Sequence, residues 1–308
     1  MLTTHTVRTL DLPPTPPLPA RGAHLSAASG LVTAGPWLYV VADDELALGR
    51  FDRHAHVPGS LVTLFDNTLP TTPHARKAAK PDLEALALLP AGPEHPFGAL
   101  IAFGSGSRPN RQRAALLALT AQGEVDGLPH AVDLAPLYRP LRTTFNDLNI
   151  EGAFVVGDAM CLLQRGNAHA GVNACICFEL DTFAAWLHGQ APAPYAESIT
   201  HFELGSIDGV PLGFTDGTPL PDGGWLFSAV AEDTRDPYLD GRCTGSIVGV
   251  VDATGTLRDT ERLIGRRKVE GISASAEGPV LHLLMVTDAD DRRSPALLLA
   301  ATLEPTPR

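Results

Sequence analysis

Apolar residues occur along this chain in short runs bounded by Gly, Pro, Asp and Asn. Five times a small or acidic residue is followed by Gly or Ala, an apolar stretch, a turn, and a second apolar stretch that ends in polar residues. The five segments begin SGLVTAGPWLYVVADD at Ser29, EALALLPAG at Glu84, EGAFVVGDAMCLLQRGN at Glu151, DGTPLPDGGWLFSAVAED at Asp216 and EGISASAEGPVLHLLMVTDADD at Glu270. Such runs predict strands that are buried between packed sheets.

The repeat has a period of roughly 55 to 65 residues, which is typical of propeller blades and other arrays. The stretch from Glu270 to the C-terminus and on from Met1 to Ser29 has about the same length, so the circuit closes. Further strand-like pieces, such as ALLALT and SIVGVVDATG, bring each unit to four strands. The sequence therefore predicts one all-β domain over residues 1–308, a five-bladed β-propeller closed through the termini. The N-terminal stretch THTVRTLDL is expected to complete the last blade.

Two segments do not follow the repeat, and we expect connections or short helices there. They are AAWLHGQAPAPYAE around Trp186 and LPHAVDLAPLYRPLRTTFNDLN at residues 128–149. Either segment has room for a strand or two. A six-bladed ring is therefore the alternative, with its extra blade drawn from residues 108–148.

The formal net charge of −12 argues against a nucleic-acid polymer or an anionic membrane as partner, because like charges repel. It favours a cation, together with a small anionic substrate or ligand at a cation site. The opening MLTTHTVRTLDLPPTPP lacks the apolar core of a secretory signal, and no apolar run reaches the ~20 residues of a membrane span. We expect a soluble cytoplasmic protein, and the sequence does not indicate its oligomeric state.

The chain has four cysteines, too few for a disulfide framework. Cys175 and Cys177 share one face of a predicted strand without favourable geometry for a bridge, and Cys161 and Cys243 lie in apolar runs. We expect four buried, reduced thiols, in keeping with a reducing cytoplasm.

The first residue of each repeat is expected to line the central channel, because the innermost strands of a propeller converge on its axis. These residues are Ser29, Glu84, Glu151, Asp216 and Glu270. Carboxylates brought together in this way repel unless a cation neutralises them, and oxygen ligands without His or Cys favour Ca²⁺. The Gly or Ala that follows each one would let the narrow channel close. The alternative is that the acids pair with Lys80, Lys268 or backbone amides.

This pattern resembles the five-bladed calcium-activated nucleotidases, or apyrases. The resemblance covers SGLV…LYVVADD, DLEALAL, NIEGAFV…LLQRGN, LGFTDG…WLFSAVAED and GSIVGVVDATGTL…RRKVEGIS, most of the chain after residue 24. It implies Ser29, Glu84, Glu151 and Glu270 as calcium ligands, whereas Asp216 stands where a hydroxyl residue is usual. The chain also resembles the phytase-like propellers and an uncharacterised bacterial propeller family. The nucleotide-binding insertions of an apyrase are not evident.

The second strand of each repeat ends in polar residues, and antiparallel pairing would place these ends around the metal. We expect a calcium-dependent hydrolase of phosphate esters or phosphoanhydrides, in which Arg165 steadies the developing charge and Asp44 or Glu232 takes the proton. The residues expected to bind the substrate are Ser105, Ser107, Arg108, Arg111, Asn167 and Asp288. Within GSGSRPNR, a phosphate-binding loop and a plain β-turn remain open, as do a basic and a structural role for His169.

Two alternatives belong to other classes of protein. The first is a non-catalytic propeller that calcium stabilises and whose mouth binds a small ligand or a protein. The second is a carbohydrate-active propeller, which requires two carboxylates beside a cleft with exposed aromatic residues. Only three Trp and four Tyr are present, which makes the second less attractive.

Overall fold

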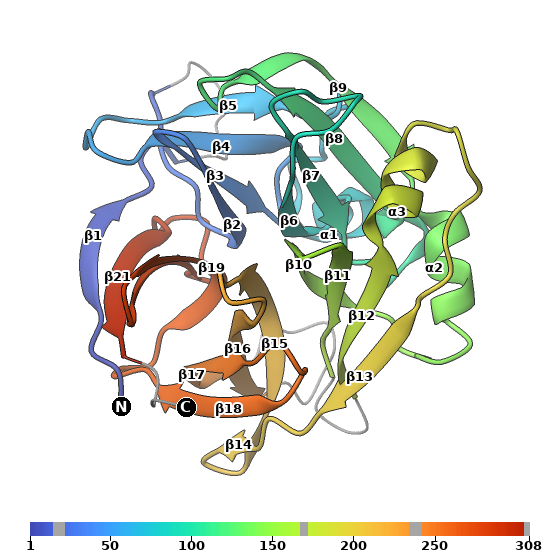
Figure 1. Cartoon of the computed structure of the whole chain (residues 1–308). Helices are drawn as coiled ribbons and strands as arrows, with labels where there is room; N and C mark the ends of the chain where they lie inside the picture. Colours follow the sequence, from blue (N-terminus) through green and yellow to red (C-terminus); the bar gives the residue numbers. More distant parts are fainter. Residues whose placement is uncertain (15–21, 167–171, 234–241, 305–308) are drawn as a thin grey trace.

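The computed structural model describes residues 1–14, 22–166, 172–233 and 242–304. These residues form five antiparallel sheets around a common axis, and one strand of each sheet lines that axis (Figure 1). The predicted all-β, five-bladed propeller is confirmed.

The blades are numbered in the order of their innermost strands along the chain. Blade 1 consists of β2 (Ala28–Ala34), β3 (Trp37–Ala42), β4 (Ala47–Asp52) and β5 (Ser60–Thr63). Blade 2 consists of β6 (Leu83–Leu89), β7 (Ala99–Gly104), β8 (Arg113–Leu119) and β9 (Val125–Asp133). Blade 3 consists of β10 (Ile150–Val156), β11 (Ala159–Gln164), β12 (Asn173–Glu179) and β13 (Ser198–Phe202). Blade 4 consists of β14 (Ser206–Ile207), β15 (Val210–Pro219), β16 (Trp225–Asp233), β17 (Arg242–Val251) and β18 (Leu257–Arg262). Blade 5 consists of β19 (Lys268–Glu277), β20 (Val280–Asp288), β21 (Leu297–Leu303) and β1 (His5–Thr9).

The N-terminal strand β1 is the outermost strand of blade 5. It pairs antiparallel with β21, from His5 opposite Ala300 to Thr9 opposite Leu297 (Figure 1). The two ends of the chain therefore share one sheet, and this pairing removes the free edge that β21 would otherwise present. Closure through the termini, predicted from the period of the repeat, is confirmed.

Short helices interrupt the strands at three connections. They are α1 (Pro73–Ala79), α2 (Ala135–Leu141) and α3 (Leu180–Leu187), and a 3₁₀ turn covers Pro109–Arg111. Residues 108–148 form this turn, β8, β9 and α2, so they complete blade 2 and add no sixth blade. The six-bladed alternative is wrong. A membrane-spanning helix is absent from the described part of the chain, where every helix is short.

The hydrophobic core is divided among the interfaces between blades. Five clusters of buried side chains occur among the described residues, one at each interface around the ring. Between blades 3 and 4, for example, Phe154 stacks on Trp225 with ring centroids 5.1 Å apart. Because both faces of each sheet are covered in this way, the strands read as continuous apolar runs.

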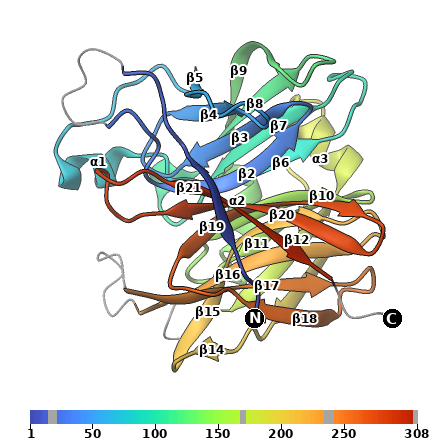
Figure 2. The same ribbon diagram turned by 90° about the vertical axis from the view of Figure 1, so that its left-hand side faces the viewer.

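Each innermost strand carries a β-bulge, which falls near the first residues of β2, β6, β10 and β19 and in the middle of β15. The residues that are skipped in the pairing are Ser29, Glu84, Glu151, Thr215 and Glu270. A bulge leaves its extra residue outside the ladder and bends the strand. The end of the axis at which the bulges lie is called the mouth below, and Figure 2 shows the blades from the side.

Candidate functional site

The five bulge residues occupy equivalent places in the five blades. Ser29, Glu84, Glu151 and Glu270 are the predicted repeat residues, whereas in blade 4 this place belongs to Thr215. The alignment of the fourth repeat on Asp216 is therefore wrong by one residue. A hydroxyl residue at this place is what the resemblance to apyrases implied.

The residue after each bulge lies where the innermost strands approach most closely. It is Gly or Ala in four blades, and a Cβ at Gly152 would lie 2.9 Å from the Cα of Asp216. A Cβ at Gly271 would lie 3.0 Å from the carbonyl carbon of Gly30. The prediction that small residues let the strands close around the axis is confirmed, and only blade 4 places a larger residue, Asp216, there.

Asp216 is fully buried and binds three backbone amides. Its Oδ2 accepts the N–H of Ile272 in blade 5 at 2.9 Å and that of Leu31 in blade 1 at 3.4 Å. Its Oδ1 accepts the N–H of Gly217 at 2.8 Å. Burial raises the pKa of Asp216 well above its usual range, and the three N–H donors oppose that rise. This carboxylate therefore links blades 4, 5 and 1.

The hydroxyl groups of the two bulge residues without a carboxylate lie close to backbone carbonyl oxygens. Thr215 Oγ1 donates to the carbonyl oxygen of Val269 at 2.9 Å and lies 2.8 Å from Ser228 Oγ. Ser29 Oγ lies 3.4 Å from the carbonyl oxygen of Ala27. Both residues are buried.

Charged side chains from all five blades meet at the mouth. In every blade the second strand runs antiparallel to the first. In blades 1, 2, 3 and 5 its polar end lies beside the bulge, as the sequence predicts, whereas in blade 4 the bulge is opposite Ser228 and Ala229 and the polar end lies further along. We call the following described residues the mouth network. Its carboxylates are Asp43, Asp82, Glu84, Glu151, Glu232, Glu270, Asp288 and Asp290, and its cations are Lys80, Arg111, Arg165 and Lys268.

Arg165 is the centre of one half of the network. Its guanidinium lies 3.1 Å from Glu151, 2.8 Å from Glu232 and 4.0 Å from Glu270, and these carboxylates belong to blades 3, 4 and 5. The three carboxylates raise the pKa of Arg165 against the opposing effect of burial. Lys268 lies 3.4 Å from Glu270 and 3.8 Å from Glu232.

Lys268 also contacts the two acids that follow β20. Its Nζ lies 3.2 Å from Asp288 and 3.0 Å from Asp290. Burial raises the pKa of Asp288 to about 6, against the effect of Lys268. One ammonium group thus serves four carboxylates.

Asp82 is the centre of the other half. Its carboxylate lies 2.9 Å from Lys80 Nζ and 2.6 Å from Arg111, and it accepts a hydrogen bond from Ser105 Oγ at 2.7 Å. Lys80 also donates to Asp43 in blade 1. With so many donors, the pKa of Asp82 falls below its usual range despite burial.

Glu84 differs from the other seven carboxylates. Each of the seven has a cation within 4.0 Å, and Glu84 has none among the described residues. Burial and the charges of Asp82, Glu151 and Asp43 raise its pKa well above the usual range. Carboxylate oxygens of Asp43, Asp82 and Glu84 lie within 4.8 Å of one another.

The mouth network contains four more carboxylates than cations, and it is largely buried. Burial raises the pKa of Glu151, and it raises the pKa of Glu270 to about 8. One buried oxygen, Glu270 Oε1, has no hydrogen-bond donor among the described residues. The predicted pairing of the acids with Lys80, Lys268 and backbone amides is confirmed, and the predicted calcium site stays a prediction.

The predicted catalytic residues lie at the mouth, but each of them forms an ion pair with another residue of the protein. Arg165 is expected from the sequence to bind an anion, and here it is committed to three carboxylates. Glu232 is one of these carboxylates. Asp44 lies 3.0 Å from Arg292, and burial raises its pKa to about 6.

Several of the predicted substrate-binding residues also contact other residues of the protein. Ser105 and Arg111 bind Asp82, and Ser107 Oγ accepts a hydrogen bond from Arg111 at 2.9 Å. Arg108 is half-buried before the turn Pro109–Arg111. Asn167, like His169, lies outside the described residues. GSGSRPNR, which begins at Gly104, contains this 3₁₀ turn, and Ser105, Ser107 and Arg111 within it contact one another.

The sequence prediction omits Asp82 and Asn149, and it names Lys268 only as a cation that pairs with the acids. Each of them stands two positions before a bulge glutamate. Side chains two apart in a strand point to the same face, which is the signal that could have found them. Asn149 Nδ2 donates to Glu151 Oε1 at 2.5 Å.

A cavity of about 410 Å³ opens beside the mouth network between blades 4 and 5. Its lining includes Cys243 from β17, Arg266 and Lys268 from the start of blade 5, and Asp288 after β20. This volume falls in the range of small-molecule pockets.

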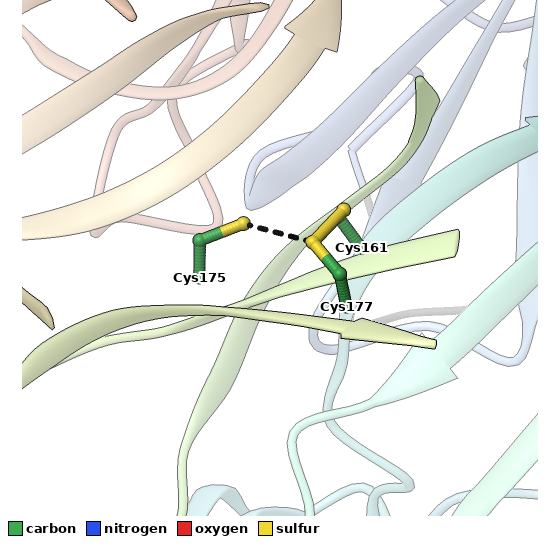
Figure 3. Close-up of side chains that lie close together, drawn as sticks. All are labelled: Cys161, Cys175 and Cys177. Atoms are coloured by element: carbon green, nitrogen blue, oxygen red, sulfur yellow. Dashed lines mark hydrogen bonds between the residues drawn. A yellow bond between two sulfur atoms is a disulfide. The ribbon is translucent and has the colours of Figure 1, made fainter. Parts of the chain in front are cut away.

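The cysteines differ from the prediction. Cys161 and Cys177 form a disulfide, with the buried thiol of Cys175 beside it (Figure 3). Cys243 is a half-buried thiol. Cys161 on β11 stands directly opposite Cys177 on β12, with the Cα atoms 4.2 Å apart. The only pair weighed from the sequence, Cys175 and Cys177, does not form a bridge. A reducing cytoplasm would not favour this bond, and the cytoplasmic location stays a prediction.

Comparison with known proteins adds a family. A family model described as a family of unknown function (DUF6929) matches residues 24–303. The chain belongs to this family. That membership agrees with the resemblance to an uncharacterised propeller family, whereas the resemblance to apyrases and phytase-like propellers receives no specific support. No curated protein matches the sequence.

Solved structures share the fold at low sequence identity. The catalytic domain of a GH62 α-L-arabinofuranosidase from Coprinopsis cinerea is 11% identical, with 99% of this chain and 98% of that chain covered and a TM-score of 0.52. A glutaminyl cyclase from Myxococcus xanthus is 9% identical, with 98% of both chains covered and a TM-score of 0.50. The tail fibre of Staphylococcus aureus phage P68 is 9% identical with a TM-score of 0.47, and the match covers 98% of this chain but 53% of the fibre protein, about half its length. These likenesses show the fold alone.

The role of Asp216 at the axis leads to a stability prediction. Asp216→Ala leaves the amides of Leu31 and Ile272 buried without an acceptor. We expect the free energy of unfolding to fall by roughly 2–4 kcal/mol, since each unsatisfied buried donor costs about 1–3 kcal/mol. Urea unfolding measures the change, with Asp126→Ala at an exposed site as the control. A loss no larger than that of the control would contradict the role.

The raised pKa of Glu270 predicts how stability depends on pH in calcium-free protein. A carboxyl group whose pKa rises on folding adds stability below its unfolded pKa, near 4.5, and loses it as the pH passes the folded value of about 8. Glu270→Gln should therefore gain stability relative to the wild type between pH 5 and pH 9. Melting temperatures in EGTA measure the difference. Glu277→Gln, at the exposed end of the same strand, should show no such trend, and a difference for Glu270→Gln that does not rise with pH would refute this.

Proposed function

We propose that this protein is a calcium-binding propeller whose mouth network holds one Ca²⁺, and whose mouth binds a small ligand or a protein partner. The observation that carries the proposal is Glu84. It is a carboxylate at the mouth without a cation in contact among the described residues. Burial and the charges of three neighbouring acids raise its pKa, against the effect of Lys80. A divalent cation would reduce this repulsion.

The donor atoms at this place suit calcium. Glu84 and Glu151 offer carboxylate oxygens from blades 2 and 3, and Asp82, which pairs with Lys80 and Arg111, lies beside Glu84. Glu270 Oε1 in blade 5 is buried without a hydrogen bond, 3.4 Å from Lys268. Calcium binds six to eight oxygen ligands and tolerates irregular geometry, whereas zinc prefers His and Cys. Ser29 and Asp216 are weaker candidates than the sequence indicated, because the Asp216 oxygens accept backbone N–H groups.

Existing ion pairs indicate where the ion would lie. Lys80 joins the acids of blades 1 and 2, and Arg165 joins those of blades 3, 4 and 5. Between blades 2 and 3, Glu84 and Glu151 repel each other, and the described residues place no cation between the two blades there. We assign the calcium site to this interface.

Calcium should raise the melting temperature, because a ligand that binds only the folded state stabilises it. Glu84→Gln should raise the melting temperature in EGTA by removing repulsion, and it should weaken calcium affinity by about tenfold or more, which corresponds to roughly 1.4 kcal/mol. Calorimetric titration and thermal unfolding with Ca²⁺, Mg²⁺ or EGTA measure both effects. Glu277→Gln is the matched control.

Arg165→Ala provides a second comparison. Loss of Arg165 leaves three buried carboxylates short of a cation, so it should destabilise the calcium-free protein and enlarge the stabilisation by calcium. The proposal fails if calcium changes the melting temperature of none of these proteins.

A calcium-dependent hydrolase is the second candidate, and the cavity beside the mouth network favours it. Asp288 lies on the wall of this cavity with its pKa raised to about 6, which suits a group that accepts a proton near neutral pH. Arg266, also on the wall, presents a cation to an anionic substrate. A bound calcium ion would supply a Lewis acid.

Under this second candidate, phosphate release from nucleotides and phosphomonoesters should require calcium and stop in EGTA. Asp288→Asn should reduce turnover by about 10²–10⁴-fold, the usual contribution of a general base, and keep the stabilisation by calcium. Asp126→Asn, at an exposed site on β9, is the control. If no EGTA-sensitive release is detected, the hydrolase candidate is rejected and calcium binding is unaffected.

A further inference from the structure

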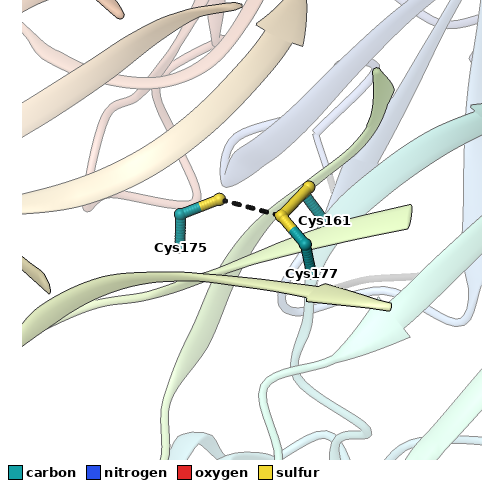
Figure 4. The surroundings of a disulfide bond; sticks show 3 residues. All are labelled: Cys161, Cys175 and Cys177. Atoms are coloured by element: carbon teal, nitrogen blue, oxygen red, sulfur yellow. Dashed lines mark hydrogen bonds between the residues drawn. A yellow bond between two sulfur atoms is a disulfide. The ribbon is translucent and has the colours of Figure 1, made fainter. Parts of the chain in front are cut away.

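Three of the four cysteines lie together between blades 3 and 4, outside the mouth network. Cys161, Cys175 and Cys177 belong to two neighbouring strands, and their sulfur atoms all lie within 4.8 Å of one another. Cys175 Sγ lies 3.6 Å from Cys177 Sγ, the nearer sulfur of the disulfide (Figure 4). One face of the β11–β12 pair thus carries a compact group of sulfur donors.

We propose that these three cysteines form a copper(I) site, which is closed while Cys161 and Cys177 are joined and opens when the disulfide is reduced. The first argument is the distance between the donors. A metal ion about 2.3 Å from each of three sulfur atoms in one plane holds them about 4 Å apart. Cys175 Sγ already lies 3.6 Å from Cys177 Sγ, and all three sulfur atoms lie within 4.8 Å of one another, so once the disulfide opens only the sulfur atoms of Cys161 and Cys177 have to move apart.

The kind and number of donors select the ion. Thiolates are soft ligands that favour Cu(I), Zn²⁺ and iron–sulfur clusters over the hard cations that suit the mouth. Structural zinc and iron–sulfur sites require four protein ligands, and the group contains three. Copper(I) accepts two or three sulfur ligands without water.

The surroundings of the sulfur atoms are dry. Cys161 and Cys175 are 1% and 5% exposed, and they belong to a cluster with Phe154, Phe202 and Trp225. Such surroundings disfavour a hydrated cation and suit one that sheds its water. Cys177 is half-buried at the edge of the cluster and provides the point of access.

The chemistry balances with a thiol as the reductant. Two equivalents of a small thiol reduce the disulfide to two protein thiols and leave as one small-molecule disulfide. Three protein thiols then bind one Cu⁺ and release three protons, because a coordinated thiol is deprotonated.

The test uses the whole protein under anaerobic conditions. Reduced and oxidised wild-type protein compete with bicinchoninate for Cu(I), whose coloured complex reports the copper that the protein does not hold. Reduced protein should retain one equivalent per chain and oxidised protein none. Cys175→Ala should lose at least about tenfold in affinity, and Cys243→Ala, a free thiol in blade 4, should behave as the wild type.

X-ray absorption keeps the proposal falsifiable if one variant folds poorly. Three sulfur neighbours around copper support the site, and two overturn it in this form. Cys175→Ser provides the second variant, and a thermal unfolding transition in the absence of metal shows that each variant is folded. Retention of copper by oxidised protein, or equal retention by Cys175→Ala, refutes the assignment.

Discussion

Five innermost strands converge on one axis, and three of them place a glutamate at the bulge that lies closest to it. Like charges cannot be buried together without compensation. Lys80, Arg165 and Lys268 provide part of this compensation, and each of them contacts acids from more than one blade. The charged groups that make the mouth are therefore also the groups that join the blades there.

The position after each bulge is occupied differently from the bulge itself. Next to each bulge a small residue lets the strands approach, and blade 4 replaces it by Asp216. Backbone N–H groups of blades 1, 4 and 5 provide the compensation for this carboxylate. Asp216 therefore has its hydrogen bonds within the protein, whereas Glu84 lacks a cation among the described residues. The sequence predicts the same role, calcium ligand, for both acids, and only their contacts in the folded protein distinguish them.

The fold could be predicted because the same pattern of apolar runs recurs five times along the sequence. The period, the buried strands and the closing role of residues 1–10 depend only on the order of apolar runs along the chain. The site could be predicted in outline, since the position of Glu84, Glu151 and Glu270 follows from the same repeat. Its details could not. Whether Thr215 or Asp216 occupies the bulge is a matter of one residue of register, which no periodicity with turns of varying length resolves.

Contacts between residues that are far apart in the sequence could not be predicted either. Arg165 and Glu232 are separated by 67 residues, so the argument from single strands left the guanidinium free to bind a substrate. The same limit explains the cysteines, because Cys161 meets Cys177 only through the register of β11 on β12.

Pairing also decides what the mouth can bind. A phosphate that displaced the carboxylates from Arg165 would leave Glu151, Glu232 and Glu270 buried without that cation, so anion capture by Arg165 opposes the stability of the ring. When all eight carboxylates are ionised, they outnumber the cations by four and repel an approaching anion. A divalent ion at Glu84 would halve this surplus, and binding of the ion would therefore strengthen binding of an anionic ligand. By linkage the ligand would strengthen binding of the ion to the same degree. A calcium ion that stabilises the blades and a calcium ion that recruits an anion are then two consequences of one charge balance.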